Sequence, residues 1–533
     1  MTDQTSSPEE KVYTSPQRKL VKFFEKSRDT WKARSLKGQA TIHRLKNRAT
    51  WLEQSRNTWK ARARQRAARI RELEAQTGQS ASGHTKKKTA YAVAPPQNRT
   101  LFLQTPRHHH YSVGVMLLFV TFVLSSVTSL RGAARAIEIV TAQIPLPVPL
   151  PPCSWATGRL WLLRLGLYKL TRPKTVADDW VWILDHSVQI GQEKCLLILG
   201  IRLSTLQNTS CRLTHADLEP LDLRPVKKST GDVVYQQLEN AVKHTGVPRE
   251  ILSDHGPDLQ SGIHQFCQAH PTTCAVYDIT HKAAALVKAF LTYDDTWDDF
   301  CRFATTMKQQ VQQTELAPLA PPAQKSKARY MNVERLGTWA GHLLDVLDEG
   351  SAVIGTTTIS DHADRGKADW VERFRDDIEV WAAVFGIVEM VEQSVRQHGL
   401  QQACVDEVEA RLHAMNTYPH VADFGENLLS FIRTESAKAH PGERLLGSSE
   451  VIESVFGKLK HIEGAQAKQG FTGLILSAAA MVGSTSAAVV QQAMETISVK
   501  AVYRWCREML GVSVQAQRQM LFAQAQQSGT KPG

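Results

Sequence analysis

The sequence lacks the paired cysteines and the leader segment that mark several classes of protein. Its 8 cysteines are spread over 533 residues without a Cys-x-x-Cys pair, so we expect neither a zinc knuckle nor a disulfide framework. This use of cysteine is typical of a protein in a reducing cytoplasm. The first residues, MTDQTSSPEEKVY, have no apolar core of the kind that a secretory signal peptide needs. With 42% hydrophobic and 22% charged residues, the composition indicates a soluble globular protein of several domains.

One stretch approaches the length of a membrane span. Val113 to Leu130 contains 18 residues without a charge, which is the lower limit for crossing a bilayer. Four of its last six residues are serine or threonine. We therefore favour a buried helix in a small helical domain, and a membrane anchor is the alternative.

Positive charge is in excess, but it is confined to an N-terminal arm. The chain has 64 Lys and Arg against 52 Asp and Glu, which gives a net charge of +12. Residues 11–74 alone contain 19 basic and 5 acidic residues, so the rest of the chain is close to neutral. A basic cluster of this kind predicts a polyanionic partner such as nucleic acid.

The arm also contains an internal repeat. FFEKSRDTWKAR at 23–34 and WLEQSRNTWKAR at 51–62 agree at 8 of 12 positions, and they are offset by 28 residues, or four heptads. Apolar residues recur at two heptad positions, interrupted at Gly38 and Arg66. We predict a basic coiled coil that pairs two copies of the chain and binds phosphates, and a solvated single helix is the alternative.

Two expected helices precede the main body, at 129–140 and 154–170. They carry three arginines that are candidates for binding DNA: Arg131, Arg159 and Arg164. We predict a helix-turn-helix-like DNA-binding region. The proline-rich joint between the helices is far longer than the usual turn of about 3–4 residues, so a helical strut between arm and body is the alternative.

From Trp180 the pattern changes to strands and helices. Short apolar strands are expected at 181–185, 195–201 and 211–223, followed by alternating helices and strands up to about Phe290. This order predicts an α/β layer. The residues that follow lack strand-like runs and have the amphipathic pattern of helices.

Two aspartates close apolar strands of this layer, Asp185 in VWILD and Asp254 in EILSD. Neighbouring strands lie about 4.8 Å apart, so carboxylates at their ends can share divalent cations. Mg²⁺ or Mn²⁺ prefers such oxygen ligands, and two of these ions serve phosphoryl transfer. His186 and His255 follow the aspartates and are expected to point away from the metals. The alternative role for each aspartate is that of a turn or capping residue.

With these residues the sequence resembles bacterial insertion-sequence transposases of the DDE type, over about residues 180–290 and 445–465 and more loosely at 113–170. The resemblance implies an RNase H-like catalytic domain. It also implies that Asp185 is the first acid and that Asp254, in SDHG, is the second.

The third acid implied by the resemblance is a glutamate on a late helix. Glu453 fits, because it comes four residues after Ser449 and seven before Lys460, as in similar transposases. Glu450 lies three residues earlier on the same helix and competes with it.

A second likeness concerns Asp278-Ile-Thr-His281, which resembles the C/D-x-x-H motif of transposases with a helical insertion, such as the hAT and Mutator-like groups. Those proteins separate the second Asp from the Glu by a long helical block. Here Asp254 and Glu453 are 199 positions apart. The alternative for His281 is a buried histidine near the start of a helix.

The resemblance and the residues together predict a transposase that cuts DNA at transposon ends and joins them to target DNA by two-metal phosphoryl transfer. Asp185, Asp254 and Glu453 would be both catalytic and metal-binding, with two Mg²⁺ or Mn²⁺ ions. The expected partners are DNA and a second copy of the chain, without a membrane, in the nucleoid of a bacterial cytoplasm. The alternatives are a non-catalytic DNA-binding protein that retains the fold, or another RNase H-like nuclease.

The predicted fold class is an α/β RNase H-like core interrupted by an all-α insertion. The predicted segments are a basic coiled-coil arm (1–76), a Ser-, Gly-, Lys- and Pro-rich linker (77–100), the helical DNA-binding region (101–172), the first part of the core (173–292), the insertion (293–445), and the Glu-bearing helix with the C-terminal helices (446–533).

Overall fold

The computed structural model of the chain describes residues 28, 101, 103–143, 151–190, 193–208, 211–292, 294–314, 316–323, 333–348, 353–354, 357–358, 366–415, 418–464 and 472–511. The chain divides into two compact units, Met1–Val93 and Ala94–Gly533, and the division falls within the predicted linker. The predicted coiled-coil arm, apart from Arg28, and the whole predicted linker lie outside the described residues.

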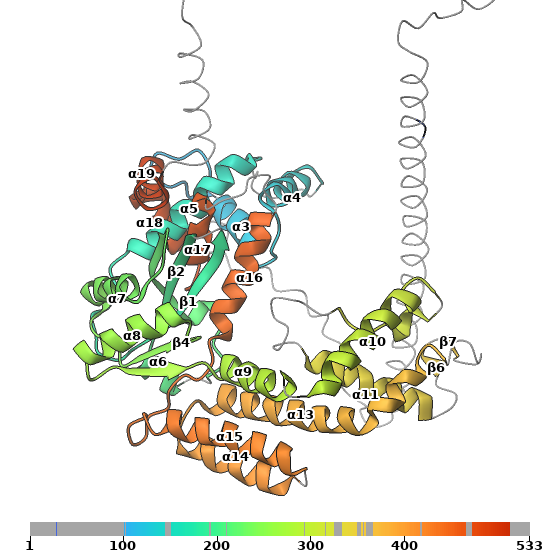
Figure 1. The fold of residues 1–533 in the computed structure, drawn as a ribbon. Helices are drawn as coiled ribbons and strands as arrows, with labels where there is room; N and C mark the ends of the chain where they lie inside the picture. Colours follow the sequence, from blue (N-terminus) through green and yellow to red (C-terminus); the bar gives the residue numbers. More distant parts are fainter. Residues whose placement is uncertain are drawn as a thin grey trace, which may run out of the picture. The chain divides into compact units, whose positions relative to one another are not determined.

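A five-stranded mixed sheet forms the centre of the second unit, in the order β3-β2-β1-β4-β5 (Figure 1). Its strands are β1 (Trp180–Ile190), β2 (Glu193–Arg202), β3 (Glu219–Val226), β4 (Glu250–Ser253) and β5 (Cys274–Tyr277). The first three pair antiparallel, whereas β4 runs parallel to β1 and β5 runs parallel to β4. This arrangement is compatible with the expected RNase H-like core.

Helices make up most of the remaining described structure. They are α3 (Val113–Leu124), α4 (Leu130–Gln143), α5 (Trp155–Thr171), α6 (Leu203–Asn208), α7 (Gly231–Thr245), α8 (Pro257–Ala269), α9 (Ile279–Thr292), α10 (Asp295–Val311), α11 (Glu334–Asp348), α13 (Arg375–His398), α14 (Gln402–Ala414), α15 (Pro419–Ser436), α16 (Glu450–Gly464), α17 (Leu476–Met481), α18 (Ala487–Thr496) and α19 (Val499–Leu510). Two short strands, β6 (Val353–Ile354) and β7 (Thr357–Thr358), pair inside the insertion, where no strand was predicted. Their β-branched side chains favour extended backbone.

The two faces of the sheet are covered by different helices. Because successive side chains of a strand point to opposite faces, Trp182 and Leu184 of β1 join one buried cluster with residues of α7 and α8. Val181 and Ile183 join the larger cluster, which includes residues of α5, α16 and α17. Asp185 and His186 therefore lie on opposite faces of the sheet.

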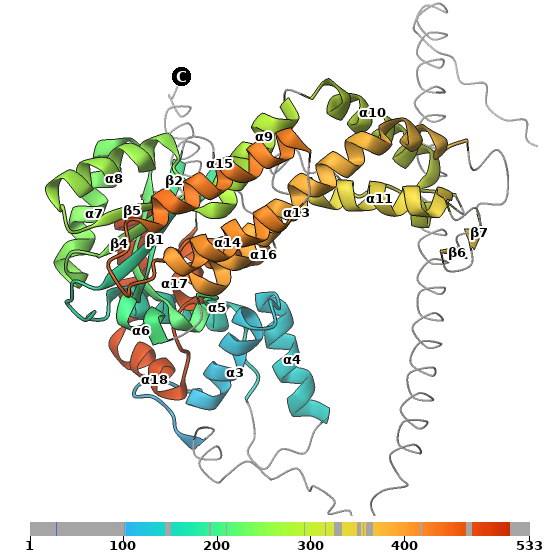
Figure 2. The same cartoon turned by 90° about the horizontal axis from the view of Figure 1, so that it is seen from below.

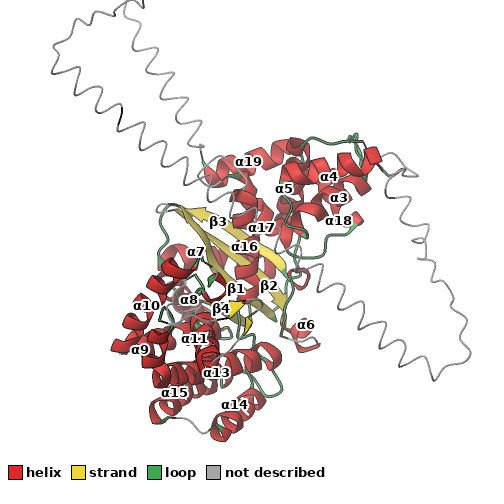
Figure 3. Cartoon of the chain, turned by 90° about the vertical axis from the view of Figure 1, so that its right-hand side faces the viewer, coloured by secondary structure: helices red, strands yellow, loops and turns green. Residues whose placement is uncertain are grey.

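The predicted DNA-binding region is joined to the C-terminal helices. Figure 3 shows α3, α4, α5, α18 and α19 gathered at one end of the sheet, and α5 packs on α17, α18 and α19. At Gly166 a Cβ atom would lie 2.1 Å from the carbonyl oxygen of Leu476, so only glycine permits this approach. Buried residues surround the second half of α5 on every side, so that half lies inside the protein, as the strut interpretation expects, and DNA binding by this region stays a prediction.

The uncharged stretch that begins at Val113 is divided between two helices. α3 ends at Leu124 after 12 residues, most of them buried, and α4 begins only at Leu130. None of the helices in the described part of the chain is long and apolar enough to span a bilayer.

The insertion is helical, as predicted, and returns to the edge of the sheet (Figure 2). Trp297 and Trp381 are buried in its core, with ring centroids 4.7 Å apart. At its end, Glu435 accepts a hydrogen bond from the backbone N–H of Tyr277 at 3.1 Å. Lys438 donates to the carbonyl oxygen of Ala275 at 2.7 Å. These two side chains bind backbone groups on the open side of the edge strand β5.

Glu250, at the start of β4, is a fully buried carboxyl group. Its Oε2 accepts the backbone N–H of Leu446 at 3.1 Å, and its Oε1 has no hydrogen-bond partner. Burial raises the pKa of Glu250 to about 8, so the group carries a proton in the folded protein at pH 7. In the unfolded chain its pKa is near 4.5, so folding binds a proton between these pH values and stability falls as pH rises from about 4.5 to about 8.

A Glu250→Gln protein should lose this pH dependence, because glutamine resembles the protonated side chain. At pH 9 its free energy of unfolding should exceed that of the parent by roughly 1–3 kcal/mol, while at pH 5 the two should differ little. Urea unfolding at pH 5, 7 and 9 measures this, with Glu334→Gln, an exposed position, as control. Parallel pH profiles for Glu250→Gln and the parent would contradict the assignment.

Candidate active site

Asp185 lies within β1 and not at its end. β1 runs on to Ile190, since β2 extends far enough to pair with it beyond Asp185, and the predicted strand end was therefore wrong. Leu184 pairs with Ser253, the last residue of β4. Asp185 and Asp254 each follow one member of this pair, so they leave neighbouring strands at the same level of the sheet.

The environment of Asp185 brings four titratable groups together. Burial, followed by the charge of Asp254, raises the pKa of Asp185 to about 7. The carboxylate of Glu453 acts in the same direction and His281 opposes it. Residues from β1, the end of β4, α9 and α16 therefore share one electrostatic neighbourhood.

Glu453 and His281 contact each other across two helices. α16 lies across β1 (Figure 1), and Oε1 of Glu453 lies 3.2 Å from Nε2 of His281. Burial disfavours the imidazolium, but the hydrogen bond with Glu453 and the charges of Asp278 and Asp254 outweigh it and raise the pKa of His281 to about 9. His281 is therefore protonated at pH 7 and donates to Glu453.

Asp278 connects the two helices that carry this pair. It is fully buried, and its Oδ1 accepts the backbone N–H of His281 at 2.9 Å, as an N-cap of α9. Its Oδ2 accepts the backbone N–H of Ser449, the residue before α16. One carboxylate thus fixes the start of both helices, which explains the spacing of the Asp-x-x-His motif.

The two competing glutamates of α16 have different surroundings. The side chain of Glu450 is 66% exposed and its Oε2 lies 3.1 Å from Nε of Arg396 on α13. Glu453 is the one that contacts His281 and acts on Asp185. Lys460, which helped to select Glu453 by spacing, is exposed.

The histidines after the two aspartates take other partners. Nε2 of His186 lies 3.0 Å from Oδ2 of Asp258, on α8 at the opposite face of the sheet. His255 adopts a left-handed backbone (φ 58) and its ring stacks on Tyr277 with centroids 4.2 Å apart. Neither has a hydrogen bond or ion pair to the acids among the interactions described.

The three arginines predicted to bind DNA differ in accessibility. Arg164 is buried, and its guanidinium donates to the carbonyl oxygens of Met494 and Ile497. This placement removes Arg164 from the predicted DNA-binding set. Arg131 is exposed and lies over the ring of Trp155 at 5.4 Å, and Arg159 is partly exposed.

The acids match a divalent cation in chemistry but do not form a closed site. Three carboxylates supply the hard oxygen donors that Mg²⁺ or Mn²⁺ prefers. Within the described ranges, no three His, Cys, Asp or Glu side chains are arranged to hold a metal ion, and Glu453 is turned to His281. Burial and then the charge of Asp254 raise the pKa of Asp185, so a cation beside it would stabilise its ionised form.

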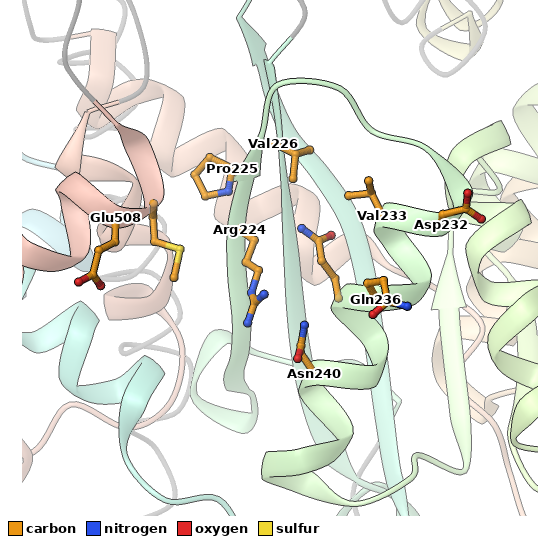
Figure 4. A pocket seen from close by; sticks show the side chains of 10 residues that line it. Arg224, Pro225, Val226, Asp232, Val233, Gln236, Asn240 and Glu508 are labelled. Carbon is orange, nitrogen blue, oxygen red and sulfur yellow. The ribbon is translucent and has the colours of Figure 1, made fainter.

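A pocket of about 450 Å³ lies elsewhere, between β3, α7 and α19 (Figure 4). Arg224, Gln236 and Asn240 are among the side chains that line it. None of the candidate acids lines it, so we do not assign it to the active site.

Comparisons with known proteins give a distant structural likeness. No protein-family model matches the chain, and no curated protein sequence does. Among solved structures, the chain is similar to the Drosophila P element transposase strand transfer complex, with a TM-score of 0.36 and 12% sequence identity, covering 76% of this chain and 98% of that chain. At this level of similarity, function has to be judged from the residues of this chain.

Proposed function

We propose that the chain is a metal-dependent polynucleotidyl transferase of the DDE transposase type, which cuts DNA at transposon ends and joins them to target DNA. One observation carries the proposal. Asp185, Asp254 and Glu453 come from three distant parts of the sequence and share one electrostatic neighbourhood on one face of the sheet.

In this proposal Asp185 and Asp254 hold the divalent cations and Glu453 is the third ligand. Such ions, when bound, activate the attacking oxygen and neutralise charge on the phosphate. The chain itself supplies position, because Asp185 lies on a central strand of the sheet and Asp254 directly follows its neighbour. The protonated His281 holds Glu453 and keeps a proton on Nε2 beside the acids.

The long insertion is compatible with this site, because its two ends are tied together. The chain leaves the core through α9 and returns just before α16. Asp278 binds the start of both helices, and the backbone N–H of Ile279 donates to the carbonyl oxygen of Gly447 at 3.0 Å. The spacing between His281 and Glu453 is therefore set locally, whatever the length of the block between them.

The test is cleavage of a plasmid that carries the DNA flanking the gene, by the full-length protein. We expect nicks with free 3′-hydroxyl ends in Mg²⁺ or Mn²⁺ and none in EDTA. DNA binding without cleavage in any divalent metal would favour the non-catalytic alternative. Cleavage without joining to a second DNA would favour another RNase H-like nuclease.

The two glutamates of α16 provide a matched pair of variants. Glu453→Gln should slow nicking at least about 100-fold, because it removes a negative ligand beside Asp185. Glu450→Gln should change the rate less than about threefold, since it loses only a partly exposed ion pair with Arg396. Initial nicking rates measure the effect of each variant, and melting temperatures show whether each variant is folded. The reverse order of effects would make Glu450 the third acid.

A further inference from the structure

A cleft of about 960 Å³ opens beside α16. One wall is the stripe of α16 that carries Glu450, Ser454 and Lys458. The others come from α3, from residues 211–216 before β3, and from residues 481–485 between α17 and α18. The cleft is therefore built on the same helix as Glu453.

Cations and hydroxyl groups dominate the polar lining of this cleft. Seven serine and threonine residues line it, together with Arg212, Arg396 and Lys458. Its one carboxylate, Glu450, is already paired with Arg396. Within the described part of the chain, neither Arg212 nor Lys458 has an ion pair with a carboxylate, so the lining carries an excess of positive charge.

Lys458 is held in position by neutral groups. Its Nζ lies 3.4 Å from Nδ1 of His215, and Nε2 of His215 lies 3.2 Å from Oγ of Ser454. Burial and the charge of Lys458 keep the pKa of His215 below its usual value, so the imidazole is neutral at pH 7. Nζ of Lys458 therefore has donors left for an anion.

Gly483, in the 481–485 wall of the cleft, has both of its backbone polar groups bonded within the protein. The side chain of Lys169 is fully buried, and its Nζ donates to the carbonyl oxygens of Ala480, Val482 and Gly483, at 2.8 to 3.0 Å. Gly483 in turn donates its N–H to the carbonyl oxygen of His215 at 2.7 Å. Because it binds Lys169, the carbonyl oxygen of Gly483 is not a free acceptor in the cleft.

We propose that this cleft binds the phosphate backbone of the DNA strand that leads to Asp185 and Glu453. Unpaired cations and hydroxyl donors are the groups that bind phosphate oxygens without reading sequence. The volume lies at the upper end of the range for small-ligand pockets, about 300–1,000 Å³, which suits a run of backbone better than one phosphate ion. The inference rests on the proposed function for the identity of the polyanion.

The first measurement is the salt dependence of DNA binding. A labelled 30-bp duplex of random sequence is titrated with full-length protein in EDTA, where cleavage is off. The Arg212→Gln, Lys458→Gln double variant should bind about tenfold more weakly at 100 mM salt, and the slope of log K against log salt should decrease by about two. Lys243→Gln, which changes an exposed lysine of α7 on the other face of the sheet, should match the parent.

The second measurement is local, because the predicted basic arm also contributes to binding. Acetylation of lysines is followed by mass spectrometry with and without the duplex. DNA should slow the labelling of Lys458 several-fold and leave Lys243 unchanged. Equal labelling of Lys458 in both conditions would overturn the proposal. Equal protection by a mononucleotide at the same phosphate concentration would also overturn it, because the ligand would then be a free nucleotide.

The two measurements separate this inference from the proposed function. Protection of Lys458 in a protein that never cleaves DNA would end the assignment of catalysis and leave the cleft as a DNA site. Normal metal-dependent cleavage with Lys458 unprotected would end the assignment of the cleft and leave catalysis in place.

Discussion

An Asp185→Asn protein should bind DNA as tightly as the parent but cut it at least about 100-fold more slowly. The side chain keeps its size and its place in β1, while the charge that would hold a divalent cation beside Asp254 is lost. Nicking rates in Mg²⁺ and duplex affinity in EDTA test the two halves of this expectation. A variant that cuts at the parental rate would end the active-site assignment.

The same substitution should make the metal-free protein more stable. Burial and the neighbouring Asp254 raise the pKa of Asp185 to about 7, so above that pH the ionised carboxylate costs stability that asparagine restores. We expect a melting temperature roughly 1–3 °C higher at pH 8. Asp222→Asn is the matched control, because burial also raises the pKa of Asp222 on β3. That protein should cleave normally.

Replacing Asp278 should have the largest effect on folding. Asp278→Ala leaves the backbone N–H groups of His281 and Ser449 without their acceptor. The loss of an N-cap and of a second buried hydrogen bond should cost about 3–5 kcal/mol. Because α9 and α16 are then no longer tied together, cleavage at a temperature where the protein is folded should also fall, by about tenfold or more. Urea unfolding and nicking rates measure both effects.

A serine at the same position separates the two roles of Asp278. Serine is a good N-cap for α9 but is too short to reach Ser449 as well. Asp278→Ser should therefore regain about 1 kcal/mol of stability over the alanine variant without regaining cleavage. Full recovery of cleavage by serine would mean that the link to α16 does not position Glu453.

The succession of strands along the chain was predictable, but the length of β1 was not. The apolar run VWIL predicts a strand, and the polar residues after Asp185 hide its continuation. β1 runs on because β2 lies opposite, with His186 and Ser187 facing Leu196 and Cys195. Pairing between strands overrides the local pattern here, and no property of the single strand reveals it.

The role of Arg164 depends on contacts that are remote in sequence. The helix is apolar on every side around it, WLLRLGL, which is a signal of burial that the charged residue obscured. Its partners, Met494 and Ile497, come more than 300 residues later. A charge that binds backbone carbonyls inside the protein cannot be told from a DNA-binding charge by sequence alone.

The choice between Glu450 and Glu453 shows the same limit. Spacing to Ser449 and Lys460 selects Glu453, but both glutamates occupy the first turn of one helix. What distinguishes them is that His281 of α9 reaches one and Arg396 of α13 reaches the other. The Asp-x-x-His motif indicates where α9 begins, and so where His281, the partner of Glu453, lies on that helix.

The side chains that close the edge of the sheet have a wider consequence. Glu435 binds the N–H of Tyr277 and Lys438 binds the C=O of Ala275, two groups of the edge strand β5 that could otherwise pair with a strand of another molecule. The end of α15 and the residues just after it therefore protect β5 from pairing with a strand of another molecule. A deletion in the insertion that spares the end of α15 should keep β5 protected. A deletion that removes the end of α15 should expose the edge of the sheet and favour aggregation.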